Sequence, residues 1–382
     1  MSFCDIAVVS TPTLERWDWR NPEKGIGGSE TSHVRMARGL HKAGLGVISY
    51  APIPEDTPED KTGLLWAPSE EFRVSDARVV INYRDSKVFE AEKPAGARWW
   101  FVAQDVDYPW SDEALAKVDR YLVLCPEHAR YTKQKYPELH RSGRLYVSSN
   151  GIDSLGIRNE TAEIFREPFR LTYASSPDRG LMLILENWFR IKERVPEAEI
   201  HVFYGFKNME TIVAANGAGD WRAAYQARLQ QLLSQPGVVW RDRVGQRELW
   251  REWAKTNVWF HPTDFPETSC ITSMEAQAAG AIPVTNRLWA LKDNVINGYL
   301  FDGIPQKSPR LKCEMIEKVI WHLRETDKRL GHPEWDSGWF ADPRMSYVKC
   351  RRNEMREAAL RRFDWGNVVG QWTKWLEEDL KG

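Results

Sequence analysis

Short apolar runs rich in β-branched residues alternate along the chain with longer stretches that carry apolar residues at helical spacing. This alternation is typical of β-α units that build a parallel sheet. In the first half we predict strands at residues 5–10, 46–51, 78–82, 98–103, 121–125 and 145–149. The clearest helix follows Gly28, with Ser29 in the N-cap position, and Gly44 ends it. The Pro- and acid-rich residues 52–58 indicate a loop.

The same pattern restarts near residue 170. We predict strands at residues 171–175, 199–204, 238–240, 258–261 and 282–285, and helices at residues 180–195, 221–233, 246–255 and 268–279. Residues 151–169 carry few apolar side chains and are predicted to be the linker. The fold class is therefore α/β, with two Rossmann-like domains facing each other across a cleft. Residues 351–380 have helical spacing with a break at residues 363–366, and the pattern leaves open where they pack.

The amino-acid composition excludes only a few classes of function. A chain of 382 residues fits two domains. The formal net charge of -1 gives no electrostatic case for a polyanionic partner, although it does not exclude one. The five cysteines are scattered and odd in number, which argues against a disulfide framework or a structural zinc site and favours the reducing cytoplasm. No apolar run reaches the roughly 18 residues of a membrane span. The 19 tryptophans are expected mainly in the core, although such rings also stack on sugars and bases.

The first candidate site is a glycine-rich turn at residues 24–30 (KGIGGSE), between a predicted strand and a predicted helix. Gly27 and Gly28 would let backbone N–H groups approach phosphate oxygens, and a helix N-terminus favours an anion. The dinucleotide pattern is not met, because Glu30 stands where its third glycine would fall. A flexible loop with a capped helix explains this segment equally well.

The second candidate is the phrase PETSCITSMEA at residues 266–276. On a helix predicted to start at Thr268, the small residues leave the backbone amides of Thr268, Ser269 and Cys270 open at the helix N-terminus. Such amides can bind a diphosphate, while the carboxylates of Glu267 and Glu275 accept hydrogen bonds from sugar hydroxyls. A capping acid and a surface acid would explain either glutamate singly, but they account poorly for the whole phrase with GAIPV at residues 280–284 after it.

Residues 267–284 closely resemble the donor-binding signature of retaining GT-B glycosyltransferases of the group 1 type, which use nucleotide sugars. The GGSE phrase at residues 27–30 resembles the N-terminal glycine loop of that family, and NGID at residues 150–153 resembles the end of its first domain. The resemblance implies an acceptor domain at residues 1–155, to which a C-terminal helix at about 355–382 returns. It implies a nucleotide-sugar donor domain at residues 165–350.

The resemblance also implies roles for the donor-site residues. Glu267 would hold hydroxyls of the transferred sugar and serve catalysis, and Glu275 would bind the ribose. Gly27 and Gly28 would lie under the donor phosphates. No metal and no bound cofactor are expected, because this family neutralises the diphosphate with basic residues and helix amides. The co-substrate would be a nucleoside-diphosphate sugar, with a UDP-sugar first, and the activity that of a retaining hexosyl-type transferase.

The phosphate clamp departs from the family pattern. Relatives carry an Arg and, a few residues on, a Lys-Gly after the first strand of the second domain, whereas this chain reads Ser175-Ser176-Pro-Asp-Arg179-Gly. Arg179 falls at the Lys position and the upstream Arg is missing. Ser175 or Ser176 could donate hydrogen bonds in its place.

The first domain departs from the pattern as well, because Gln104 stands where many relatives have a His near the sugar. Asp105 follows at the carboxyl end of a strand, where it could orient an acceptor hydroxyl, accept its proton, or simply cap the next turn. His128 is a similar candidate, whereas His261 is expected to be packed. Asp105 and Asp107 formally match an Asp-x-Asp metal phrase, which we discount because of the family's metal-free chemistry.

The acceptor is the open question. Trp17 and Trp19 lie among basic residues, a composition that suits a glycan, a lipid-linked sugar or a hydroxymethylated base in phage-type DNA. Residues 1–155 carry 20 Lys plus Arg against 23 Asp plus Glu, so no basic face is implied and a saccharide is favoured over modified DNA. A sugar-nucleotide epimerase and a non-catalytic binding protein remain as alternatives, whereas a phosphorylase-like protein would need a pyridoxal-bearing Lys region that we do not find in the sequence.

Overall fold

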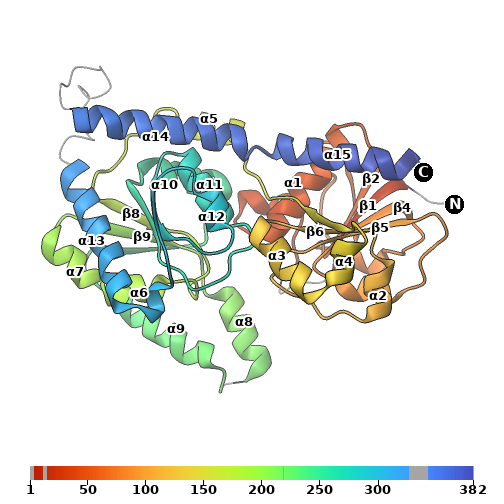
Figure 1. Ribbon diagram of the computed structural model, residues 1–382, viewed down its shortest axis with the longest axis horizontal. Coiled ribbons are helices and arrows are strands. Elements are labelled where there is room, and N and C mark those ends of the chain that lie inside the picture. Colours follow the sequence, from red (N-terminus) through yellow and green to blue (C-terminus); the bar gives the residue numbers. More distant parts are fainter. Residues whose placement is uncertain (1–3, 12–14, 218, 327–342, 382) are drawn as a thin grey trace. The chain divides into compact units, whose positions relative to one another are not determined.

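The computed structural model describes residues 4–11, 15–217, 219–326 and 343–381. It divides into two compact units, shown in Figure 1. The first unit consists of Met1–Ile152 together with Phe363–Gly382, and the second of Asp153–Arg362. Each unit contains one sheet in which all the paired strands are parallel. The predicted α/β class is therefore confirmed.

The first unit is a seven-stranded sheet with the strand order β3-β2-β1-β4-β5-β6-β7. Its strands are β1 (Cys4–Ser10), β2 (Val47–Ala51), β3 (Leu65–Pro68), β4 (Ala77–Tyr83), β5 (Arg98–Val102), β6 (Arg120–Val123) and β7 (Leu145–Val147). Its helices are α1 (Gly28–Lys42), α2 (Asp112–Lys117), α3 (Pro126–Lys135), α4 (Pro137–Arg141) and α15 (Trp365–Lys381), with short 3-10 helices η1 (Asn21–Glu23), η2 (Ser69–Glu71) and η3 (Ser86–Glu90).

Both faces of this sheet are covered, which explains why its strands are apolar along their whole length. Ile6 and Val8 of β1 point to the face covered by α1 and α15, which lie side by side in Figure 1. Ala7 and Val9 point to the other face, where η3, α2 and α4 supply the core.

Helix α15 is fixed to this sheet by a polar anchor as well as by its apolar face. Asp379 accepts a hydrogen bond from the indole N–H of Trp100 (2.7 Å) and pairs with the buried Arg120, whose Nη2 lies 2.9 Å from Oδ1. Glu378 also pairs with Arg120, but its side chain is 65% exposed. A C-terminal segment is thereby tied to β5 and β6, far away in sequence.

The second unit is a six-stranded sheet with the order β10-β9-β8-β11-β12-β13. Its strands are β8 (Arg170–Tyr173), β9 (Glu199–Phe203), β10 (Val238–Asp242), β11 (Val258–His261), β12 (Ile282–Asn286) and β13 (Tyr299–Phe301). Its helices are α5 (Ser154–Thr161), α6 (Leu181–Glu186), α7 (Trp188–Arg194), α8 (Lys207–Asn216), α9 (Trp221–Leu232), α10 (Gln246–Lys255), α11 (Ile271–Ala278), α12 (Leu291–Asn294), α13 (Pro309–Thr326) and α14 (Pro343–Arg362), with η4 (Pro305–Lys307).

The two strand orders place a topological switch point in each sheet. In the first unit the chain runs outward in opposite directions from β1 and β4, and in the second unit from β8 and β11. Ligands of open α/β sheets bind outside the carboxyl ends of the strands at such a point. The loops after β1 and β4, and after β8 and β11, are therefore the first places to look for chemistry.

Several elements differ from their sequence prediction. The helix predicted for residues 180–195 is interrupted at Asn187, whose side-chain amide donates to the carbonyl of Leu183. Edge strands β3 and β13 were not predicted. Residues 151–169, predicted to be a linker, contain α5, whose Ile157 is fully buried. The predicted break in the C-terminal helical stretch is present between α14 and α15.

We expect Asp379→Ala to destabilise the first unit much more than Glu378→Ala. The first variant leaves the Arg120 guanidinium and the Trp100 indole without their buried acceptor, at a cost of about 3 kcal/mol. The second removes only an exposed ion pair, worth less than about 1 kcal/mol. Urea unfolding followed by tryptophan fluorescence measures both, and equal losses for the two variants would contradict the assignment of Asp379 as the anchor.

Candidate functional site

The switch point of the second sheet brings two loops together. Gly180 has φ 110° and precedes α6, and a Cβ atom at this position would overlap the carbonyl oxygen of Pro262, just after β11. Only a residue without a side chain permits this approach. The turn before it is fixed by the Ser176 carbonyl, which accepts hydrogen bonds from the Tyr173 hydroxyl (2.7 Å) and from the backbone N–H of Arg179 (3.0 Å).

This approach places Arg179 against Glu267. Arg179 Nη1 lies 3.1 Å from Oε1 and 3.0 Å from Oε2 of the carboxylate, and the guanidinium carbon lies 3.9 Å from the centre of the Phe265 ring. Glu267 is only 4% exposed. Burial by itself would raise the pKa of Glu267, but the charges and hydrogen bonds of Arg179 and His261 outweigh it and hold that pKa below its usual value. Glu267 is therefore an anion with its own counter-ion.

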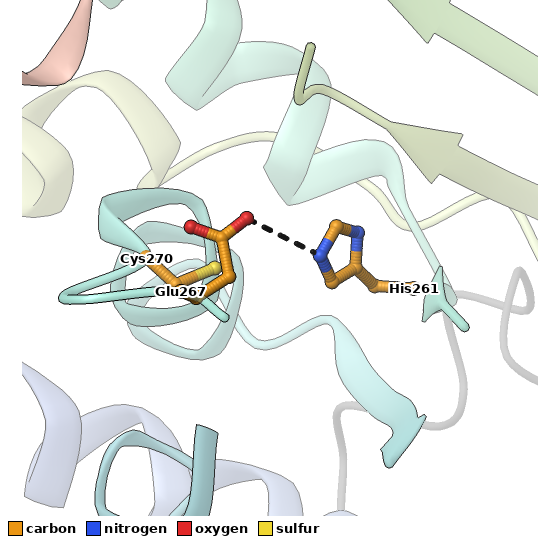
Figure 2. A group of neighbouring side chains, drawn as sticks. All are labelled: His261, Glu267 and Cys270. Carbon is orange, nitrogen blue, oxygen red and sulfur yellow. Dashed lines mark ion pairs between the residues drawn. The ribbon is translucent and has the colours of Figure 1, made fainter. Parts of the chain in front are cut away.

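His261 and Cys270 complete the immediate surroundings of Glu267 (Figure 2). His261 Nε2 lies 3.7 Å from Glu267 Oε1, and the potential ligand atoms of the three residues all lie within 4.8 Å of one another. A His, a Cys and a carboxylate are ligands that Zn²⁺ accepts. However, Arg179 already supplies a positive charge to Glu267, and burial together with the Glu267 charge raises the pKa of Cys270 to about 12. This charge balance favours a neutral thiol beside an ion pair over a metal cage.

The approach to α11 corrects one prediction. The helix begins at Ile271 and not at Thr268, because the N-cap residue Cys270 has left-handed backbone angles, φ 56° and ψ 69°. Thr268, Ser269 and Cys270 are buried in an irregular segment, so their amides do not form the first turn of the helix. Among the described residues, the Ser269 hydroxyl and Arg179 Nε are buried without a hydrogen-bond partner, which marks them as contacts for a ligand or for water.

Ser175, Ser176 and Glu275, which were also predicted for the donor site, lie in the same unit, whereas Gly27 and Gly28 belong to the first unit. Ser175 is buried and Ser176 is half-buried, and both belong to the turn that carries Arg179. Glu275 lies inside α11 and is 2% exposed. Its Oε1 accepts hydrogen bonds from the Trp250 indole at 2.8 Å and from the Gln246 amide at 3.0 Å.

The switch point of the first sheet carries a second charged group. Gly27 is the N-cap of α1 and the exposed Gly28 is its first residue. Glu30 folds back over this loop, since a Cβ atom on Gly27 would overlap its Oε2. Arg84, the first residue after β4, reaches both Glu30 (Nη1 to Oε1, 3.4 Å) and Asp105 (Nε to Oδ2, 2.8 Å). The sequence analysis missed Arg84.

Burial and backbone conformation shape the group formed by Glu30, Arg84 and Asp105. Burial raises the pKa of Glu30 in spite of the nearby Arg84 charge. Arg84 has φ 69°, a left-handed conformation that aims its side chain from the strand end. Its position two residues after the strand predicted at 78–82 was the one available signal, because only the strand order shows that the ends of β1 and β4 are adjacent.

Three sequence motifs of the first unit meet next to Asp105. Gln104 Nε2 lies 3.3 Å from Asn150 Oδ1 and 3.4 Å from Ser32 Oγ, joining the end of β5 to the NGID phrase and to α1. Asp107 turns away from Asp105 and pairs with Lys135, while Tyr136 donates to it at 3.1 Å. The two carboxylates of the Asp-x-Asp phrase thus have different cations.

The residues predicted to contact the acceptor differ in how far they are buried. His128 is fully buried, and burial lowers its pKa to about 4 in spite of the nearby Asp105 and Asp107 charges, so its ring is neutral. Trp17 is fully buried against His33 and other core residues, which gives it a packing role and no surface for stacking in this structure. Trp19 is half-buried, donates to the Pro58 carbonyl and lies under Arg38.

No protein-family model matches the sequence, and no curated protein sequence is significantly similar to it. In the part of the chain that the structure describes, every helix is too short or too polar to cross a membrane.

Solved structures of glycosyltransferases are similar over the whole chain. AviGT4, a glycosyltransferase involved in avilamycin A biosynthesis, is 15% identical with a TM-score of 0.65, over 99% of this chain and 98% of that chain. The catalytic domain of starch synthase IV from Arabidopsis thaliana, bound to ADP and acarbose, is 12% identical with a TM-score of 0.64, over 100% of both chains. HepE from Anabaena, in complex with UDP and glucose, is 11% identical with a TM-score of 0.63, over 98% and 100%. These likenesses show the GT-B fold that the sequence motifs implied.

We expect Arg179→Met to destabilise the second unit by about 2 to 3 kcal/mol at pH 7.5 and by less at pH 5. In the wild type the lowered pKa of Glu267 means that its ion pair stabilises the fold above the unfolded pKa, and that this contribution is lost as the pH falls through the folded pKa. Without Arg179, burial raises the pKa of Glu267 and penalises the charged form as the pH rises.

The control is the double variant Arg179→Met/Glu267→Gln, whose stability difference from the wild type should not vary with pH over this range. Thermal or urea unfolding at both pH values measures the effect. A pH-independent loss in the single variant would show that the Glu267 charge does not depend on Arg179.

Proposed function

We propose that the protein is a glycosyltransferase that moves a sugar from a nucleoside-diphosphate sugar to an acceptor hydroxyl, with retention of the anomeric configuration. The observation that carries the proposal is the pairing of Arg179 with the buried Glu267 at the switch point of the second sheet, with Glu275 about one turn into α11. The Arg179 cation suits the phosphates of a sugar nucleotide, and the two carboxylates suit its sugar hydroxyls.

In the proposed donor site, Arg179 contacts the diphosphate. The Ser269 hydroxyl and Arg179 Nε, both without partners among the described residues, supply further donors. Glu267 accepts hydrogen bonds from hydroxyls of the transferred sugar, and Glu275 accepts them from the ribose. We propose UDP as the nucleotide, in line with the similar HepE structure that contains UDP and glucose.

The chemistry is proposed to need little from the protein beyond binding and charge. The donor phosphate itself takes the proton of the acceptor hydroxyl as that hydroxyl attacks from the side of the leaving group. Arg179 stabilises the charge that develops on the diphosphate, and Glu267 orients the sugar. No bound metal is required in this proposal, so an excess of chelator should not remove activity.

We propose a saccharide acceptor, bound by the first unit at Asp105, which Arg84 (2.8 Å) and the Tyr108 hydroxyl (3.3 Å) hold in place. The group formed by Glu30, Arg84 and Asp105 carries two carboxylates and one guanidinium, so it adds no net positive charge. This disfavours a polymer that is rich in phosphate. Asp105 is proposed to orient the acceptor hydroxyl, and Trp19 is proposed as a lower-ranked contact.

The decisive experiment is an assay of the purified protein with UDP-, ADP- and GDP-sugars, alone and with saccharides or hydroxymethylated DNA, with and without chelator. Saccharide-dependent release of nucleoside diphosphate supports the proposal, and the anomeric configuration of the product, read by NMR, tests retention. Transfer to DNA would overturn the acceptor, activity lost with chelator and restored by Mg²⁺ or Mn²⁺ would overturn the metal-free mechanism, and binding without turnover would point to a non-catalytic protein.

Glu267→Gln is expected to lower kcat by about 10²- to 10³-fold, because a contact that strengthens in the transition state is lost. The KM for the donor should change much less. Glu186→Gln, which alters an exposed glutamate of the same unit, serves as the matched control and should behave as the wild type. A Glu267→Gln enzyme with the wild-type kcat would remove Glu267 from the catalytic site.

Arg179→Ala is expected to weaken the binding of UDP by about 10- to 100-fold and that of uridine hardly at all, since a hydrogen bond to a charged phosphate is worth about 1.5 to 3 kcal/mol. Because this variant also leaves Glu267 unpaired, Arg179→Ala/Glu267→Gln should be measured beside it. Calorimetry that gave equal losses for UDP and uridine in the double variant would contradict a phosphate contact.

A further inference from the structure

Two side chains of α10 hold the carboxylate of Glu275 on the neighbouring helix α11. The Trp250 indole N–H donates to Oε1 at 2.8 Å, and the Gln246 side-chain amide donates to the same oxygen at 3.0 Å. Trp250 and Glu275 are each only 2% exposed. A buried acceptor oxygen that receives two hydrogen bonds is held in one orientation.

The donor ring is itself held rigidly. Trp250 packs under α5 at Gly156, where an added Cβ atom would come within 2.6 Å of the indole carbon Cζ3. Gln246 and Trp250 are four residues apart, so they lie on the same side of α10. Helices α5, α10 and α11 together therefore determine the direction in which the Glu275 carboxylate points.

We propose that Trp250 and Gln246 are positioning residues that fix the Glu275 carboxylate for the two neighbouring hydroxyls of a ribose. Through this contact the protein selects ribonucleotides over 2′-deoxyribonucleotides. The inference rests on the proposed function, in which Glu275 meets the ribose. A site built to accept a hydrogen bond from a hydroxyl rejects the analogue that lacks it, provided that the acceptor is held in place. A Glu275 free to rotate would bind either sugar with similar affinity.

The chain offers a matched control on the same helix. Trp253 is fully buried on α10, but its indole N–H has no hydrogen-bond partner among the described residues. Trp250→Phe therefore removes an indole together with a hydrogen bond to Glu275, whereas Trp253→Phe removes an indole alone. Both variants lose similar volume from the core.

The experiment measures the dissociation constants of UDP and 2′-deoxy-UDP by calorimetry for the wild type, Trp250→Phe and Trp253→Phe, with ADP and GDP pairs in place of UDP if either binds more tightly. The wild type is expected to favour the ribonucleotide by about tenfold, the value of one hydrogen bond. Trp250→Phe should reduce this ratio to about one to three, and Trp253→Phe should leave it unchanged even if it lowers the thermal stability.

A ratio that falls equally in both variants, or in neither, overturns the positioning role, as does a wild type that binds both nucleotides equally. A wild type that binds no nucleoside diphosphate at all overturns the proposed function instead. If Trp250→Phe does not fold, Gln246→Leu, at a half-buried position, should lower the same ratio in the same direction, and an unchanged ratio there contradicts the inference.

Discussion

The second unit depends on one buried charge interaction, the contact of Arg179 with Glu267. Burial disfavours the charged form of a carboxylate that is 4% exposed, and the cation that offsets this cost comes from a different loop. Compared with well-packed apolar residues of similar volume, such a pair contributes little net stability, because removing two charges from water costs about as much as their attraction returns, whereas removing one partner alone is costly. In the proposed function, the pair keeps a cation and an anion side by side, where a ligand with phosphates and hydroxyls can contact both.

The first unit repeats this arrangement at its own switch point. Arg84 lies in the loop after β4, and Glu267 lies in the loop after β11. The charge of Arg84 is balanced by two carboxylates, those of Glu30 and Asp105. In both sheets the crossing of loops at the carboxyl edge gathers polar groups from segments that are far apart in sequence. The strand order therefore explains why the candidate chemistry lies where it does in each unit.

The sequence predicted the α/β class and most central strands because a strand buried on both faces is apolar throughout. The edge strand β3 escaped prediction, since its sequence LWAP ends in a proline and Leu65 is 64% exposed. The start of α11 was predicted three residues too early because the left-handed angles of Cys270 depend on tertiary packing. Arg84 required the strand order, and Trp17, read as a stacking surface, is a core residue.

The structure places Glu267, Glu275 and Arg179 in one unit, but the motifs did not reveal which side chains hold each of them. The contacts of Glu275 come from Gln246 and Trp250, which belong to a different helix and lie more than twenty residues upstream. A motif records residue types and their spacing along the chain. The side chains behind them carry ordinary helical spacing, which is indistinguishable in the sequence from simple packing.

The Arg179–Glu267 ion pair is sensitive to substitution of Gly180. Neither charge of the Arg179–Glu267 contact sits on the glycine, yet any side chain at this position would push the backbone of Pro262 away and separate the two loops. Placing Arg179 and Glu267 alone on another parallel sheet would consequently not reproduce the pair. Gly180 and its left-handed backbone conformation would have to be included. The ion pair therefore depends on the close backbone approach of Gly180 to Pro262, which is possible because Gly180 has no Cβ atom.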